Sequence, residues 1–125
     1  MGSENKFNLR RRAASFGYAL AGIRQMLQTQ HNAWIHLAAT VLVLIAAFIY
    51  QLSRAEWIAV IAAMALVWSA EAVNTAFEFL CDIVHPGFFP AVEKAKNIAA
   101  AAVLICATGA AVIGALVFIP HLLAR

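Results

Sequence analysis

Residues Trp57–Leu80 read WIAVIAAMALVWSAEAVNTAFEFL, and this stretch decides the fold because it is apolar enough to cross a bilayer. It also contains Glu71 and Glu78, and an ionised carboxylate in hydrocarbon is costly unless something compensates or uses it. With Asn74 between them the spacing is i, i+3, i+7, so a helix places all three on one stripe, which Asp82 extends by a turn. Two carboxylates and an amide on one face can hold a divalent cation or move a proton.

A structural explanation for this polar stripe has to be weighed beside the functional ones. Membrane helices also use polar side chains to bind neighbouring helices through hydrogen bonds. Paired carboxylates such as Glu71 and Glu78 are harder to explain in this way than a single Ser or Asn, because each brings an ionisable group into hydrocarbon.

Composition places the whole chain in lipid. Hydrophobic residues make up 64% and charged residues 12% of the 125 residues, and the mean hydropathy is +0.82. A soluble domain of this length is far less apolar. Because a separate soluble catalytic module does not fit, an active site has to be built from helix ends, interfacial loops and neighbouring subunits. We therefore expect one small membrane domain that self-associates.

Three apolar stretches approach or exceed the roughly 20 residues that cross a hydrocarbon core. They predict an all-α membrane protein in which the spans are joined by short connections, and the second connection contains the helix breakers Pro86, Gly87 and Pro90. The predicted spans are Ala33–Tyr50, with His36 as its strongly polar residue, Trp57–Leu80, and Ile98–Ile119, which is uncharged.

The segment before the first span has a basic and amphipathic pattern. Four apolar residues recur at helical spacing, at Phe16, Leu20, Ile23 and Leu27, and arginines supply positive charge among them. This pattern predicts a helix that lies in the membrane interface. A signal peptide is rejected, because polar residues interrupt the apolar run and no small-residue cleavage site follows it. We divide the chain into an N-terminal segment, 1–30, and a three-helix transmembrane domain, 31–125.

Lys and Arg are distributed unevenly among the segments outside the spans. Arg54 and Arg125 lie on one side, and seven lie on the other. Because these residues concentrate on the cytoplasmic side, we expect the N-terminus and the second connection to be cytoplasmic, so the carboxylates face the compartment that holds nucleotide and magnesium. The seven residues are Lys6, Arg10, Arg11, Arg12, Arg24, Lys94 and Lys96.

A basic rim beside carboxylates suits phosphate chemistry at a lipid surface. Lys94 and Lys96 can neutralise phosphate oxygens, and carboxylates can hold Mg²⁺ that bridges those oxygens. Ordinary topogenic charge explains the two lysines equally well. No G-x-x-x-x-G-K-[ST] motif occurs, so a P-loop is excluded. Cys81 and Cys106 lack C-x-x-C spacing and are expected to be buried thiols, and the histidines form no zinc pattern.

Two strings of residues resemble the prokaryotic diacylglycerol kinase family, which includes the undecaprenol kinases. The first is Glu71–Glu78, EAVNTAFE, and the second is Lys94–Val103, KAKNIAAAAV. The resemblance extends from about Phe16 to the C-terminus. It implies an ATP-dependent lipid kinase in a bacterial inner membrane, a homotrimer with active sites shared between subunits. The implied partners are ATP, a lipid alcohol (diacylglycerol or undecaprenol) and the membrane, and not nucleic acid.

The resemblance also assigns roles to individual residues. It implies that Glu71 is the general base and that Asn74 positions the hydroxyl or the γ-phosphate. It implies further that Glu78 is a ligand of Mg²⁺ and that Lys96 contacts phosphate. Arg11 and Tyr18, on the interfacial helix, match positions where the family touches nucleotide.

The chain departs from the family pattern at four positions. A second metal-binding Glu is usual where Gln30 stands, and an amide oxygen can bind Mg²⁺ but brings no charge, so lower metal affinity is expected. Asn97 replaces a common Asp near the nucleotide, Trp34 an Arg, and Phe89 a His. A catalytically weakened or silent relative that acts as a lipid-binding or structural membrane protein therefore stays an alternative to the kinase. A small ion or proton carrier is a third reading, but it leaves the E-x-x-N-T-A-x-E string unexplained.

Overall fold

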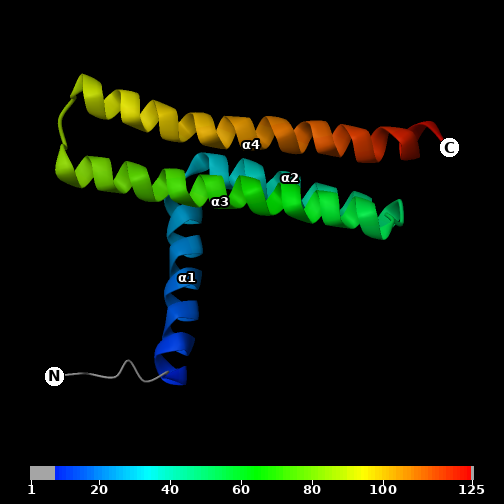
Figure 1. Cartoon of the computed structure of the whole chain (residues 1–125), viewed down its shortest axis with the longest axis horizontal. Coiled ribbons are helices and arrows are strands. Elements are labelled where there is room, and N and C mark those ends of the chain that lie inside the picture. Colours follow the sequence, from blue (N-terminus) through cyan, green and yellow to red (C-terminus); the bar gives the residue numbers. More distant parts are fainter. Residues whose placement is uncertain (1–7, 125) are drawn as a thin grey trace.

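The computed structural model describes residues 8–124, which form four helices and no strand. Three of them, α2, α3 and α4, are long and apolar enough to cross a membrane. They lie side by side, whereas α1 leaves the bundle crosswise (Figure 1). The predicted all-α fold with three membrane helices is confirmed. The bounds are α1 (Leu9–Thr29), α2 (His31–Ile49), α3 (Arg54–Val84) and α4 (Pro90–Leu123).

Helices α3 and α4 extend well beyond the predicted spans. They contain 31 and 34 residues, whereas roughly 20 cross the hydrocarbon core, so their ends continue past it. Pro90, which was expected to break a helix in the connection, is instead the first residue of α4. Proline is accepted there because the N–H groups of the first turn have no partner within the helix. Of the charges that predicted the orientation, Lys6 and Arg125 lie outside the described residues.

A sharp corner at Gln30 joins α1 to α2. The backbone of Gln30 is extended, with φ −117° and ψ 116°, and its N–H donates to the Met26 carbonyl at 2.9 Å. The Trp34 indole N–H donates to the Leu27 carbonyl at 2.8 Å, which satisfies one of the carbonyl groups left over at the end of α1. These two hydrogen bonds fix Gln30 at the end of the bundle where α1 meets α2.

The other end of the bundle is held by a small core and a set of polar contacts. Ala47, Leu52, Val60 and Val117 are buried together there. Ser53 and Glu56 form a capping box at the start of α3, and the same Glu56 carboxylate contacts His121 Nε2 of α4 at 2.9 Å. The start of α3 is thereby tied to the end of α4.

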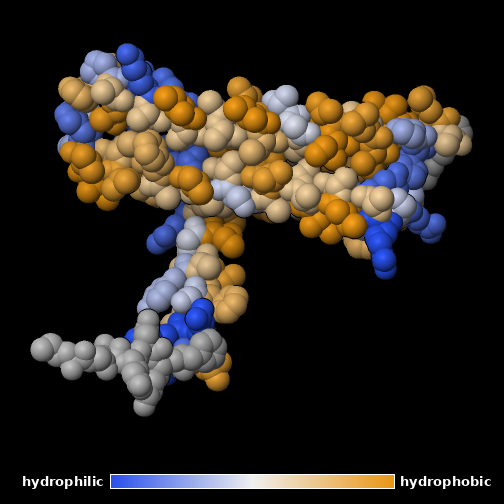
Figure 2. Space-filling model, viewed as in Figure 1, coloured by the Kyte–Doolittle hydropathy of each residue, from blue (hydrophilic) through white to orange (hydrophobic). Residues whose placement is uncertain are grey.

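Most of the remaining apolar surface points outward. Large apolar side chains of α2, α3 and α4 are exposed in the single chain, and Figure 2 shows them covering the bundle while polar residues gather at its ends and along α1. An apolar surface of this extent needs lipid or another protein chain to cover it.

Replacing Ser53 with Ala is expected to lower the thermal unfolding midpoint in detergent. The substitution removes the capping oxygen that accepts the Glu56 N–H at 3.3 Å, a loss that costs about 1 kcal/mol. Ser15→Ala is the matched control, because Ser15 lies inside α1 and only donates back to the Arg11 carbonyl. Circular dichroism melts of the two variants check this, and equal midpoints would contradict it.

Candidate functional site

The polar stripe of α3 faces the inside of the bundle. The exposed fractions of Glu71, Asn74 and Thr75 are 1%, 6% and 4%, and these are the buried polar residues among residues 8–124. The Thr75 hydroxyl donates to the backbone carbonyl of Glu71 at 2.8 Å and is satisfied. The carboxylate and the amide are therefore the buried polar groups whose purpose has to be explained.

Both carboxylate oxygens of Glu71 are buried and lack a hydrogen-bond partner. His36 of α2 is the basic group beside them, with its Nε2 3.6 Å from Glu71 Oε2, which is too long for a hydrogen bond. A buried carboxylate without a partner is costly. The Glu71 oxygens can therefore accept a hydrogen bond from an O–H or N–H group of a bound molecule.

Glu78 lies at the corner between α1 and α2. Its carboxylate accepts the Asn74 Nδ2–H at 3.1 Å and the Gln30 Nε2–H at 3.3 Å. Asn74 Oδ1 is buried and has no hydrogen-bond partner. The structure thus brings together one carboxylate and two amides that come from two different parts of the chain.

One carboxylate and two amides suit an ion such as Mg²⁺, which also takes ligands from water and substrate, better than a metal bound by protein side chains alone. No group of three or more His, Cys, Asp or Glu side chains within residues 8–124 could hold a metal. Mg²⁺ usually takes only one or two carboxylates and completes its shell with water and substrate phosphates. Glu78 supplies one carboxylate, and Asn74 Oδ1 is a buried amide oxygen without a hydrogen-bond partner.

All of these groups line one cavity of about 280 Å³ between α2, α3 and α4. Glu71, Asn74 and Glu78 form its α3 side, and His36 of α2 and Gln30 at the corner before α2 face them. The α4 side is apolar and consists of Ala100, Val103, Leu104 and Ala107. We call this the polar cavity.

Other residues singled out in the sequence lie elsewhere in the single chain. Asp82, the last member of the stripe, is outside the polar cavity and accepts a hydrogen bond from Lys96 Nζ at 2.9 Å. Asn97 is exposed on α4. Arg11 and Tyr18 are exposed on α1, Tyr18 by 77%. Lys96 is thus beside a carboxylate of α3 within the single chain, whereas Arg11 and Tyr18 are exposed on α1 away from the polar cavity.

The sequence reasoning missed the pairing of His36 with Glu71. In the sequence His36 does not stand out from the other histidines. Its position inside a predicted span, where an ionisable residue needs a partner, was the signal that could have identified it. Its ring also packs edge-on against Trp68, with 6.3 Å between the ring centroids, and the Trp68 indole N–H donates to Thr40 at 3.0 Å. Only the packing of α2 on α3 could identify these partners.

Comparison with known proteins matches the sequence of this chain to one family. A family model described as "Prokaryotic diacylglycerol kinase" matches residues 17–118. The chain is 34% identical over 119 residues to the undecaprenol kinase of Bacillus subtilis, covering 95% of this chain and 97% of that protein. It is also 34% identical over 110 residues to the diacylglycerol kinase of Synechocystis sp., covering 87% of this chain and 63% of that protein.

Replacing Glu71 with Met is expected to stabilise the protein in the absence of substrates. The substitution exchanges a buried carboxylate without partners for an apolar side chain of similar size, which removes a penalty of about 1–3 kcal/mol. Glu56→Met is the matched control and should destabilise, because Glu56 has partners in Ser53 and His121. Thermal melts in detergent measure both variants. A lower midpoint for Glu71→Met would mean that the carboxylate is satisfied in the membrane.

Proposed function

The chain belongs to the prokaryotic diacylglycerol kinase family and is a membrane lipid kinase, and we propose that it transfers the γ-phosphate of MgATP to the hydroxyl of a lipid alcohol within the polar cavity. The observation that carries this proposal is the pair of Glu71 oxygens, buried without a partner beside His36. A general base needs an acceptor within hydrogen-bond reach of the substrate proton, and these oxygens can accept one.

In the proposed reaction, Glu71 accepts the proton of the lipid hydroxyl while the hydroxyl oxygen forms a bond to the γ-phosphorus. The bond between that phosphorus and the β–γ bridging oxygen breaks, and ADP leaves with the electron pair. Asn74, whose buried Oδ1 has no partner, positions the hydroxyl or the γ-phosphate. His36 lies against Glu71 and keeps the carboxylate in place.

Glu78, with the amide oxygens of Gln30 and Asn74, is the proposed holder of Mg²⁺. When bound, the ion neutralises negative charge on the phosphate oxygens. The two amides already contact the Glu78 carboxylate, and rotation of each amide by half a turn presents oxygen in place of nitrogen. The same rotation removes the two amide hydrogen bonds from the Glu78 carboxylate, whose oxygens can then bind the metal.

The nucleotide-binding residues are proposed to meet the carboxylates in an assembly of several copies. Lys96 and Asn97 lie near the start of α4, and Arg11 and Tyr18 lie on α1. A homotrimer would let α1 of one copy approach the polar cavity of another, and the exposed apolar surface of the single chain favours such an assembly.

The proposed site opens to the cytoplasm of a bacterium, at its inner membrane. The crosswise direction of α1 in Figure 1 supports a helix that lies in the membrane interface, with the connection between α3 and α4 beyond it. The lipid alcohol is diacylglycerol or undecaprenol, since relatives carry both names and both lipids present a hydroxyl on an apolar body.

Replacing Glu71 with Gln is expected to reduce phosphate transfer by about 10²–10⁴-fold, which is the usual contribution of a general base. Purified protein in mixed micelles receives labelled MgATP with diacylglycerol or undecaprenol, and labelled lipid phosphate is counted. Glu56→Gln is the control, because that carboxylate lies at the other end of the bundle. A wild-type protein that labels neither lipid would refute the proposed function.

Replacing Glu78 with Gln is expected to raise the Mg²⁺ concentration for half-maximal activity by about tenfold, and Gln30→Glu should lower it, because affinity for such cations follows the charge of the ligands. Glu93→Gln is the control, since Glu93 is exposed in the first turn of α4 and does not line the polar cavity. Magnesium titrations of the initial rate measure this. An unchanged requirement in Glu78→Gln would remove it as a ligand.

A further inference from the structure

Each turnover of the proposed reaction leaves a proton on Glu71, and that proton has to leave before the carboxylate can act as a base again. Glu71 is 1% exposed, and the nearby Thr75 hydroxyl already donates to its backbone carbonyl at 2.8 Å. The amide of Asn74 forms hydrogen bonds but is not a base. A neighbouring side chain with a basic nitrogen would restore Glu71 for the next turnover.

His36 is that neighbour. Its Nε2 lies 3.6 Å from Glu71 Oε2, and its side chain is 15% exposed, whereas that of Glu71 is 1% exposed. Both residues line the polar cavity. The imidazole ring thus lies beside the buried carboxylate and also borders the open space of the cavity, where water can reach it.

A second pair of histidine and glutamate shows how a purely structural contact differs from this one. At the other end of the bundle, His121 Nε2 lies within hydrogen-bond distance of Glu56 Oε1, at 2.9 Å, and the pair ties α4 to α3. The His36 ring forms no hydrogen bond to another residue within 8–124. Its nitrogens are therefore free to accept and release a proton.

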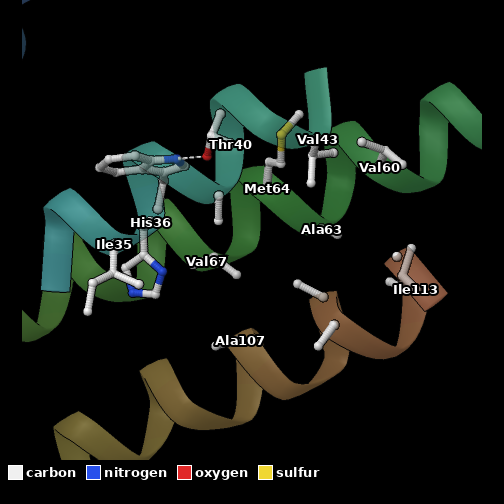
Figure 3. A pocket seen from close by; sticks show the side chains of 15 residues that line it. Ile35, His36, Thr40, Val43, Val60, Ala63, Met64, Val67, Ala107 and Ile113 are labelled. Atoms are coloured by element: carbon white, nitrogen blue, oxygen red, sulfur yellow. Dashed lines mark hydrogen bonds between the residues drawn. The ribbon is translucent and has the colours of Figure 1, made fainter. Parts of the chain in front are cut away.

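Packing holds the His36 ring in place instead of hydrogen bonds. The ring lies edge-on to Trp68, with 6.3 Å between the ring centroids, and the Trp68 indole N–H donates to Thr40 at 3.0 Å, one turn along α2 from His36 (Figure 3). Trp68 and Thr40 line a second cavity of about 350 Å³, and among the described residues around it His36 alone is ionisable. A proton on the ring therefore finds its exit on the other side, in the polar cavity, where the ionisable groups of α3 are Glu71 and Glu78 and the α4 wall is uncharged.

We propose that His36 relays the proton from Glu71 to the polar cavity, a role that rests on the proposed function. The Nε2 lone pair forms a bond to the proton on Glu71, while the O–H bond breaks and its electron pair stays on the carboxylate. The imidazolium then gives one proton to water in the cavity and returns to neutral imidazole. One proton thus leaves for each phosphate transferred. The 3.6 Å separation has to shorten by about 0.5 Å for this step, and acid–base pairs are often this loose before substrates bind.

Quenched-flow kinetics separate the first turnover from the later ones. His36→Gln keeps an amide of similar size that cannot carry the proton. Because Glu71 regains its basic form during the incubation before mixing, we expect a burst of lipid phosphate at the wild-type rate. Later turnovers should slow by about 10²-fold, the lower end of what a positioned acid–base group contributes. His121→Gln is the matched control and should keep both phases, since His121 does not line the polar cavity.

Steady-state kinetics and chemical rescue test the ring itself. In His36→Gln, kcat should fall while kcat/KM for ATP and for the lipid stays unchanged, because this ratio contains only steps up to phosphate transfer. His36→Ala leaves space for a small heterocycle. Added imidazole should restore its later turnovers, whereas pyrazole, a much weaker base of the same size, should not. His121→Ala should not respond to imidazole.

Three results would overturn the relay. Later turnovers at the wild-type rate in His36→Gln would mean that water alone takes the proton from Glu71. A first turnover slowed as much as the later ones would give His36 a positioning role, and so would rescue by pyrazole equal to rescue by imidazole. An active wild-type kinase with an unaffected His36→Gln variant loses the relay alone, whereas a wild-type protein that labels neither lipid loses the proposed function as well.

Discussion

The constraint on which the rest of the structure depends is the burial of the Glu71 carboxylate inside a membrane helix. Hydrocarbon does not solvate a carboxylate, so the helices around it have to shield it and give it a use. Helices α2 and α4 cover it so completely that 1% of the residue is exposed, yet they leave both oxygens without a hydrogen bond. A carboxylate buried at such a cost, beside His36 and a cavity, calls for a function.

The corner at Gln30 connects this buried site to the membrane surface. Because α1 turns away crosswise at that residue, its amide meets Glu78 at the level where the bundle begins (Figure 1). The cluster thus has the corner on one side and a second, mostly apolar cavity of about 350 Å³ on the other. Polar and mostly apolar walls thus follow one another along the same three helices.

The single chain leaves much of its apolar surface uncovered. Its apolar side chains point outward on every membrane helix, and residues that the family resemblance assigns to nucleotide, such as Arg11 and Tyr18, stand away from the carboxylates. Lipid or another protein chain has to cover the exposed apolar surface.

The sequence by itself determined the fold class, because runs of about 20 apolar residues allow only helices in a bilayer. It also determined that Glu71, Asn74 and Glu78 share a face, since that follows from helical spacing alone. Helix ends were less predictable: caps and Pro90 extended α3 and α4 past the apolar spans. Only the tertiary structure decided that His36 lies beside Glu71, that the Asp82 side chain pairs with Lys96 outside the polar cavity, and that a second cavity adjoins the first. These features depend on the packing between helices, which the period of a single helix does not contain.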